Sequence, residues 1–368
     1  MPILLYTYLF SEILAPFFSS FLILNGILFL GKLVPFLDTI FNFNISFSDF
    51  LRICAYILPN LFLFSLPMAG MMGVIICFSR LSADNEIMAI KACGIGFYRL
   101  LPPVVVFSLC TALLTGLCAV SLIPQGNVSM KRLLFQLAKE KIDKGLTENH
   151  FSEGIKNLVI YIDRIDSDDK QWHGVYMSDM RHKGATLNVV ASTGTINSHM
   201  DDMRITLILF DGTIHRSVGE TTQTVQFKRY ELELPMENPK FIGDDRASYV
   251  GKGEMSQKEL VERADHYGRN TKKGATMLIE YHKRLVLSAG CLILGLLGLP
   301  LAIQSRPGAR SLGLPLGLAF FVFYYILITA GKSISESGTL PVSVVMWMPN
   351  ILFGLIAIYL IRKAGKEM

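Results

Sequence analysis

The chain has 368 residues, of which 51% are hydrophobic and only 18% are charged, and its mean hydropathy is +0.42. This composition excludes an ordinary water-soluble domain and indicates that part of the chain is surrounded by lipid. The formal net charge of +5 comes from Lys and Arg residues scattered along the sequence. Nucleic-acid binding is therefore not expected, because it needs these residues gathered in a patch or stripe.

Six apolar stretches are long enough to cross a hydrocarbon core of about 30 Å, which takes roughly 20 helical residues. Any one of them has the alternative of a buried core helix or an interfacial helix, but six in one chain favour a polytopic membrane protein. The opening residues MPILLYTYLF lack the basic segment and cleavage site of a secretory signal, so the first span is expected to remain. The predicted spans are 9–33, 53–78, 101–122, 285–303, 312–330 and 344–361.

Charges in the short loops predict the orientation, because Lys and Arg are retained on the cytoplasmic side of a membrane. The loops after the first and fifth spans carry little basic charge, namely Arg52 and Lys332. Both termini are therefore predicted to be cytoplasmic, and the long middle region is predicted on the opposite side. The basic residues assigned to the cytoplasmic side are Arg80, Lys91, Arg99, Arg306, Arg310, Arg362, Lys363 and Lys366.

The middle region, roughly 124–274, changes from continuous apolar runs to the alternating pattern of β-strands. Many short strands separated by turn residues are typical of a sandwich, a jelly roll or a partly open β-structure. A jelly roll with an exposed edge is the favoured interpretation. The region contains no cysteine, so a disulfide framework is not expected. Alternating runs begin at Asn157, Gly174, Thr186, Met203 and Thr224.

A short amphipathic helix is predicted over 256–267, because Ser256 and Glu259 have the spacing of a capping box. The predicted fold class is thus an α-helical polytopic membrane protein with six spans, three plus three, and an inserted periplasmic β-jelly-roll domain. The predicted domains are 1–123 with spans one to three, 124–254 with the β-jelly roll, 255–274 with the amphipathic linker helix, and 275–368 with spans four to six.

Motifs of enzymatic chemistry are weak in this sequence. Residues 26–32 match the first part of a phosphate-binding loop, but Leu33 replaces the required Ser or Thr and no strand precedes the motif. The seven histidines form no pair at the spacing of metal ligands. The chain is therefore expected to be a non-catalytic subunit that binds no metal and no cofactor of its own.

Three cations lie at the ends of predicted spans on the side opposite the termini, namely Lys32, Arg284 and Lys332. One interpretation is snorkelling, in which a long side chain anchors the end of its helix at the interface. The other is a ring of cations that holds an anionic lipid headgroup. The spacing alone leaves both interpretations open.

The loop after the second span has the sequence SRLSADNEIMAIKACGIG from Ser79 to Gly96. Its apolar positions fit a short amphipathic helix at about 80–97, with Ser82 or Asp84 as a cap. Such a helix is either a surface element across the membrane face or a docking element for a moving partner subunit.

At this loop the chain resembles the lipopolysaccharide-export permeases of the LptF/LptG family. The similarity covers the three-plus-three spans, the inserted β-domain and above all the SRLSADNEIMAIKACGI segment, which resembles the family's cytoplasmic coupling helix. The FDGTIHR stretch from Phe210 and the following VQFKRYELEL run resemble strands of the family's jelly roll and favour the LptF branch.

The resemblance implies a permease half of an ABC exporter in a Gram-negative inner membrane. Implied partners are a sister permease (LptG-type if this is LptF), two copies of an LptB-type cytosolic ATPase that uses ATP and Mg, a periplasmic jelly-roll protein of LptC or LptA type, and lipopolysaccharide. By motif position the resemblance implies ATPase coupling by Glu86, Asp84, Ala92 and Gly94, and substrate binding by Lys32, Lys332 and Arg284.

Two other classes of membrane protein remain as alternatives. One is a mechanotransmitting permease of a lipoprotein-release or efflux assembly, but such permeases place the large domain after the first span. The other is a structural or signalling membrane protein without transport activity, which would not copurify with an ATPase.

Overall fold

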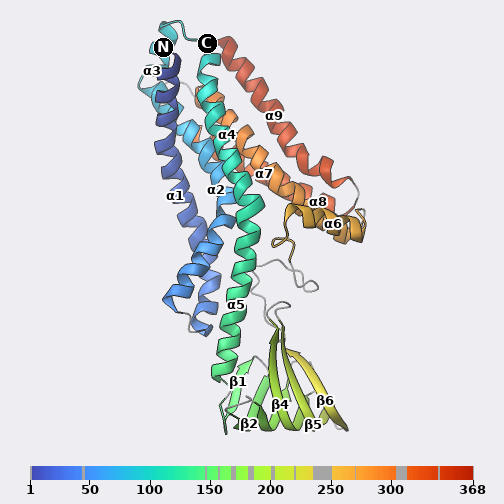
Figure 1. Cartoon of the computed structure of the whole chain (residues 1–368). Coiled ribbons are helices and arrows are strands. Elements are labelled where there is room, and N and C mark those ends of the chain that lie inside the picture. Colours follow the sequence, from blue (N-terminus) through green and yellow to red (C-terminus); the bar gives the residue numbers. More distant parts are fainter. Residues whose placement is uncertain are drawn as a thin grey trace. The chain divides into compact units, whose positions relative to one another are not determined.

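The computed structural model describes residues 2–43, 46–145, 147–155, 158–166, 171–180, 186–199, 204–218, 221–234, 251–269, 271–303, 313–338 and 340–367. The chain divides into two compact units, which we call the helical unit (1–37, 51–128 and 250–368) and the sheet unit (38–50 and 129–249). Figure 1 shows the elements of both.

The helices run in chain order through long apolar segments and short polar ones. They are α1 (Pro2–Phe43), α2 (Phe47–Ala83), α3 (Glu86–Ala92), a 3₁₀ turn (Phe97–Leu100), α4 (Leu101–Leu117), a π-helical segment (Cys118–Leu122), α5 (Ile123–Gly145), α6 (Gln257–Tyr267), α7 (Lys272–Ile303), α8 (Gly313–Glu336) and α9 (Val342–Glu367). Both chain termini lie at the same end of the helical unit as α3 (Figure 1).

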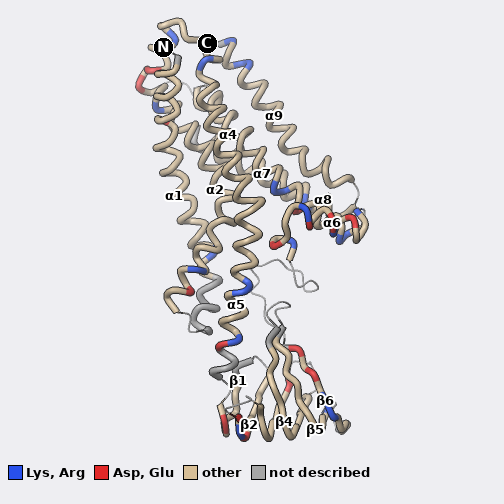
Figure 2. The backbone as a smooth tube through the Cα atoms, viewed as in Figure 1, with Lys and Arg blue, Asp and Glu red and all other residues tan. Residues whose placement is uncertain are grey.

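The six predicted spans are confirmed, because six helical segments among the described residues are long and apolar enough to cross a membrane. Charged residues are sparse along these segments (Figure 2). Lys and Arg, drawn in blue, lie at the end that holds the termini. Helix α7 starts at Lys272, earlier than the predicted start at 285. The sequence pattern missed these first turns because Glu280, Lys283 and Arg284 make the stretch look like a loop, whereas in the structure Lys283 and Arg284 both pair with Glu280.

The third span continues as a helix far beyond its predicted end. The polar region was predicted to begin at 124, but α5 extends to Gly145, so residues 124–145 are helical instead of β-structured. Pro124 is tolerated because it lies at the first turn of α5, next to the π-helical segment, where the ladder of backbone hydrogen bonds already shifts. Beyond the apolar part, α5 is amphipathic, which the sequence pattern of a single apolar run does not reveal.

Helix α7 is central to the helical unit and contacts α4, α6, α8 and α9. Small residues allow these close approaches: a Cβ added at Gly295 would lie 2.2 Å from the Ser108 Oγ of α4, and one at Gly298 would lie 3.2 Å from Val74 of α2. These glycines therefore let α7 pack closely against α4 and α2, between the first three spans and the last three.

A buried polar cluster joins the last three spans. The Tyr324 hydroxyl of α8 donates to the Asn350 Oδ1 of α9 at 2.6 Å, and the Asn350 Nδ2 donates to the Val286 carbonyl of α7 at 3.0 Å. A hydroxyl and an amide in a low-dielectric interior need such partners, because an unpaired polar group there costs several kcal/mol. The three helices are thereby fixed against one another in register.

The spans differ in how much of their surface the chain itself covers. In the most apolar stretch of each helix, 72% of α2 and 67% of α7 are buried within the chain. The corresponding shares are only 17% for α1 and 22% for α8. Apolar side chains such as Leu22, Ile27, Val322 and Ile326 are correspondingly exposed. Helices α1 and α8 therefore present apolar faces to the surroundings of the chain, whether lipid or another protein.

The sheet unit confirms the predicted inserted β-domain. Its described strands form one antiparallel sheet in which every strand pairs with the next in sequence, in the order β1-β2-β3-β4-β5-β6. Alternate residues such as Leu158, Ile160 and Ile162 are buried on one face, where the fully buried Phe135 of α5 packs with them. The strands are β1 (Phe151–Ile155), β2 (Leu158–Ile165), β3 (Trp172–Asp179), β4 (Thr186–His199), β5 (Arg204–Val218) and β6 (Thr221–Leu234).

The sheet is irregular along one row that crosses β3, β4 and β5. Gly174 has a φ of 64° and Asp211 has a φ of 49°, and both flank Ser192, where the regular pairing of β4 with its neighbours is interrupted. The Ser192 Oγ donates to the Asp211 carbonyl at 3.0 Å in its place. Such local distortions bend strands and increase their twist, so the long strands curve at this row.

Helix α6 begins as the sequence predicted. The Ser256 Oγ accepts from the Glu259 N–H at 3.3 Å, and the Glu259 carboxylate accepts from the Ser256 N–H at 2.8 Å, which completes a capping box. The Ser256 N–H holds the pKa of the Glu259 carboxyl below its ordinary value. Leu260 and Ala264 are buried and pack with Met277 of α7, so α6 lies against α7 by its apolar face.

Candidate functional site

The predicted coupling segment folds as a tight turn followed by a short helix. Helix α2 continues to Ala83, and α3 begins only at Glu86, so the helix is shorter than the predicted 80–97. The predicted caps Ser82 and Asp84 are wrong, because Asn85 is the N-cap, with a left-handed φ of 63° and no capping bond from its side chain. Asparagine tolerates this conformation better than most residues, which explains the position of the turn.

Glu86, the predicted coupling acid, contacts the N-terminal part of α1. The Tyr8 hydroxyl donates to the Glu86 Oε2 at 2.8 Å. One turn further along α1, Glu12 forms an ion pair with Arg80 at the end of α2. Because Tyr8 and Glu12 lie four residues apart on one helix face, α1 holds both sides of the turn that precedes α3. Sequence reasoning missed both residues, although a carboxylate at position 12 inside an apolar run was a usable signal.

The other predicted coupling residues lie on the exposed surface of the same segment. Asp84 is exposed in the turn, and Ala92 is the exposed last residue of α3. Gly94 has a φ of 77°, and its N–H donates to the Lys91 carbonyl at 2.9 Å, which ends the helix. The structure thus brings Glu86, Ala92 and Gly94 together on one short hairpin at the surface of the helical unit, where Ile87 packs into the core.

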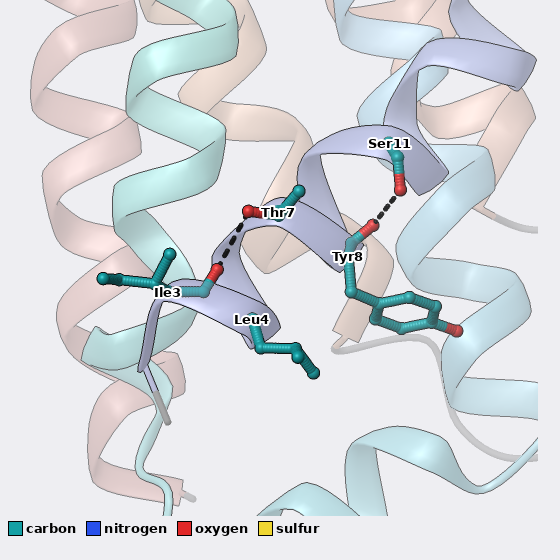
Figure 3. Close-up of a pocket in the computed structure, with 5 residues that line it drawn as sticks. All are labelled: Ile3, Leu4, Thr7, Tyr8 and Ser11. Atoms are coloured by element: carbon teal, nitrogen blue, oxygen red, sulfur yellow. Dashed lines mark hydrogen bonds between the residues drawn. The ribbon is translucent and has the colours of Figure 1, made fainter.

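An open apolar groove lies beside this hairpin at the beginning of α1. Figure 3 shows its lining side chains, Ile3, Leu4, Thr7, Tyr8 and Ser11, all from the first three turns of the helix. Ile3 and Leu4 are 78% and 80% exposed, and Met88 of α3 is 64% exposed. The end of the helical unit that carries Glu86 therefore combines a carboxylate with exposed apolar side chains.

Two of the three predicted substrate cations are exposed on spans. Lys32 is exposed on α1, and Lys332 is exposed near the C-terminal end of α8. The Lys332 Nζ lies 3.8 Å from the Glu336 carboxylate one turn away, with 48% of its side chain exposed. An ion pair this exposed contributes little, so Lys332 can exchange its partner for another anion.

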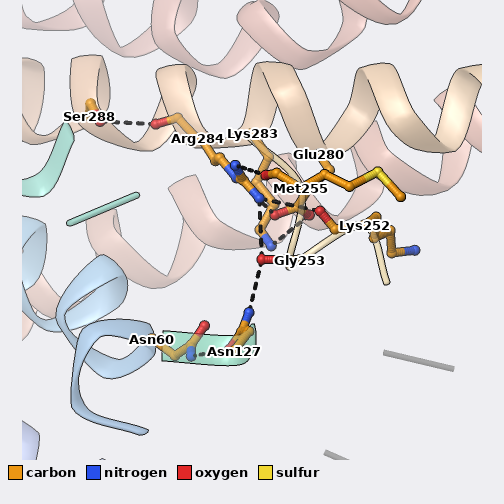
Figure 4. A network of polar contacts seen from close by, with 9 residues as sticks. All are labelled: Asn60, Asn127, Lys252, Gly253, Met255, Glu280, Lys283, Arg284 and Ser288. Carbon is orange, nitrogen blue, oxygen red and sulfur yellow. Dashed lines mark hydrogen bonds and ion pairs between the residues drawn. The ribbon is translucent and has the colours of Figure 1, made fainter. Parts of the chain in front are cut away.

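Arg284, the third predicted substrate cation, is buried. Only 1% of its side chain is exposed, and its guanidinium donates to the Met255 carbonyl at 2.9 Å and to the Lys252 carbonyl at 3.3 Å. Its Nε lies 3.5 Å from the Glu280 carboxylate. Figure 4 shows these groups converging on one guanidinium. The arrangement favours a role in holding the backbone of 252–255 over direct contact with a substrate.

Within the described ranges, no cluster of three or more His, Cys, Asp or Glu side chains is placed to bind a metal ion. The residues 26–32 that match part of a phosphate-binding loop lie inside α1 as regular helix. Their backbone N–H groups therefore bond within the helix and do not form the open loop that cradles a phosphate.

The fold and the hairpin define a class: a polytopic membrane protein of three plus three spans around an inserted antiparallel sheet, with a short helix displayed after the second span. The chain belongs to the lipopolysaccharide export system permease family LptF/LptG, whose family model matches residues 7–363. It is thus a multi-pass protein of the inner membrane.

Individual relatives match over most or part of the chain. The lipopolysaccharide export system permease protein LptF of Escherichia coli (strain K12) is 21% identical over 363 residues, which are 96% of this chain and 93% of that protein. The LptF of Shigella flexneri matches to the same extent. An uncharacterized protein of Rickettsia prowazekii (strain Madrid E) is 22% identical over 158 residues, which are 43% of this chain and 44% of that protein.

Proposed function

We propose that this chain is an LptF-type permease subunit of an ABC exporter, which extracts lipopolysaccharide from the outer leaflet of the inner membrane and passes it to a periplasmic jelly-roll bridge. The family match over residues 7–363 is the observation that carries the proposal. In this assembly a sister permease and two cytosolic ATPase copies complete the exporter. The chain contributes no ATP hydrolysis, and ATP and Mg are used by the ATPase.

The hairpin at Glu86 is the proposed contact with the ATPase. Its half-buried carboxylate and the exposed Met88 give the mixed polar and apolar surface by which short helices dock into grooves. Tyr8 of α1 bonds to Glu86, and Glu12 of α1 pairs with Arg80 at the end of α2. A displacement of α3 is therefore transmitted to the first span through a hydrogen bond and an ion pair. In this proposal both termini are cytoplasmic and the sheet is periplasmic, where an edge strand hands lipid onward by pairing with a similar domain.

Neutralising the two exposed span cations tests the proposed substrate contact. The double substitution Lys32→Gln with Lys332→Gln is expected to lower photocrosslinking of lipopolysaccharide by about tenfold or more, because each cation near an anionic lipid surface contributes about 1 kcal/mol. The measurement is the crosslinked yield per permease in membranes. Lys363→Gln with Lys366→Gln removes the same charge near the C-terminus and serves as the control. An unchanged yield in the test pair would establish the snorkelling interpretation instead.

A pull-down from membranes tests the proposed assembly. Affinity-tagged chain, extracted in mild detergent, is expected to bring down an ATPase, a second six-span permease and a single-span periplasmic jelly-roll protein. Mass spectrometry identifies the three. Absence of the ATPase from a stable, folded preparation would contradict the exporter and leave a membrane protein without transport activity.

A further inference from the structure

The hairpin that carries Glu86 is connected to a second long helix besides α1. The 3₁₀ turn at Phe97–Leu100 follows the hairpin directly and contacts α9, whose last turns lie at the end of the helical unit where α3 also lies (Figure 1). Ala364 of α9 is buried in the same apolar cluster as Ile87 of α3 and Phe97 of the turn. We call Tyr98, Ala364 and Gly365 the α9 contact.

Gly365 lets the 3₁₀ turn approach the backbone of α9. A Cβ added there would lie 2.6 Å from the Tyr98 hydroxyl oxygen and 2.7 Å from the Tyr98 Cζ, so the ring lies directly against the helix. Gly365 belongs to regular helix and has no positive φ, so its backbone conformation does not require a glycine. The close approach of Tyr98 is therefore what this glycine accommodates.

The other part of α9 is fixed to α8, the helix that carries Lys332. A Cβ added at Gly331, next to Lys332, would lie 3.3 Å from the Val345 carbonyl of α9. Further along the same pair of helices, the buried Tyr324 hydroxyl donates to the buried Asn350 Oδ1 at 2.6 Å. Closely packed interiors transmit displacement instead of absorbing it, so α8 and α9 are expected to move together.

The two exposed cations that are proposed to bind lipid thus lie on spans that are both connected to the hairpin. Lys32 lies on α1, whose Tyr8 donates to Glu86. Lys332 lies on α8, which is joined to α9 and through it to the turn that follows α3. Coupling between distant sites is carried by such chains of packed side chains and hydrogen bonds. Each cation therefore has a connection of its own to the hairpin.

We propose that the α9 contact is a second coupling connection, in which Tyr98 and Gly365 are positioning residues that transmit the state of the lipid-binding spans to the ATPase-contacting hairpin. This inference rests on the proposed export function and adds a role for the sixth span. It assigns no ligand to the contact. Because α1 keeps its own connection, loss of the α9 contact weakens the stimulation of ATP turnover by lipid without abolishing it.

The test uses the complete exporter, assembled with its sister permease and ATPase and reconstituted with and without lipopolysaccharide. Gly365→Ala adds a Cβ that displaces the half-exposed Tyr98 ring from α9. We expect stimulation by lipid to fall at least about fivefold, the lower end of ordinary coupling between sites, while basal hydrolysis and the yield of copurified ATPase stay unchanged. Tyr98→Ala, which removes the ring, should give the same loss, whereas Tyr98→Phe, which keeps it, should retain the stimulation.

The control is Gly354→Ala, the same substitution in the same helix at a position where an added Cβ has open space, and it should retain full stimulation. Combining Gly365→Ala with Tyr98→Ala should cause no further loss than Tyr98→Ala alone, because both substitutions break one contact. Losses that multiply in the double variant would mean that the two residues act independently and would overturn the inference. Unchanged stimulation in either single variant would overturn it as well.

A merely structural contact would lower basal and lipid-stimulated hydrolysis in the same proportion, and that result also contradicts the proposed coupling. Should Gly365→Ala fail to accumulate, Tyr98→Ala decides under the same criteria, because its ring is half exposed and its removal leaves the buried cluster in place. Absence of lipid-stimulated hydrolysis in the unsubstituted complex would overturn the proposed function itself.

Discussion

Glu86→Lys is expected to abolish lipid-stimulated ATP turnover of the assembled exporter while the permease stays folded. The residue begins α3 on a displayed hairpin, so the substitution reverses a charge where the proposed ATPase contact lies. Like charges brought together in an interface cost several kcal/mol, enough to prevent docking. Within the chain, the substitution removes the hydrogen bond from Tyr8, whose net contribution of about 1 kcal/mol does not threaten the fold.

Phosphate release with and without lipopolysaccharide, together with the yield of copurified ATPase, measures this effect. Tyr8→Phe removes only the hydroxyl that orients Glu86 and should give a partial loss of stimulation. Glu262→Lys, the same reversal on the exposed face of α6, is the control and should behave as the unsubstituted chain. Full turnover in Glu86→Lys would remove the coupling role from this residue.

Gly290→Ala is expected to be the most destabilising single substitution among these tests. A Cβ at this position of α7 would lie 1.9 Å from the Tyr324 hydroxyl, which Asn350 and Val286 hold in place. Tyr324 must then leave its buried partners, so overpacking of about 1–3 kcal/mol adds to the loss of a buried hydrogen bond of about 1 kcal/mol.

The apparent midpoint of thermal unfolding, followed in detergent by the fluorescence of a thiol-reactive dye on the buried cysteines, should fall by at least about 5 °C. Gly354→Ala in α9 is the matched control, because a Cβ there meets nothing within 4 Å. The two substitutions have the same intrinsic helix propensity change, so the difference between them isolates the clash with Tyr324. Equal midpoints would mean that α8 can shift away without cost.

Features set by local sequence were predictable. Apolar length predicted the six spans, and the capping box predicted α6. The start of α3 was not predicted, because Ser82 and Asp84 looked like the caps, whereas the turn is set by Asn85 in a left-handed conformation without a capping bond from its side chain. The extension of α5 was missed for a related reason, since a proline next to a π-helical segment resembles a helix end in sequence.

The site was harder to predict than the fold because its contacts join distant residues. The hydrogen bond from Tyr8 to Glu86 joins residues 78 positions apart in the sequence, and the bond from Asn127 to the Gly253 carbonyl joins residues 126 positions apart. A charge at a span end gives the same sequence signal whether it faces an anionic lipid or a set of backbone carbonyls. The exposure of the side chain distinguishes the two cases: Arg284 is buried against backbone carbonyls, whereas Lys332 is exposed.

The sequential order of the sheet bears on how the chain is made. Each described pairing joins consecutive strands, so the sheet needs no segment that is synthesised later. Local pairings of this kind close quickly, because the loops between partners are short. The nascent sheet can therefore complete its ladders while the ribosome is still translating α7 to α9, so the sheet can fold before the last three helices are made.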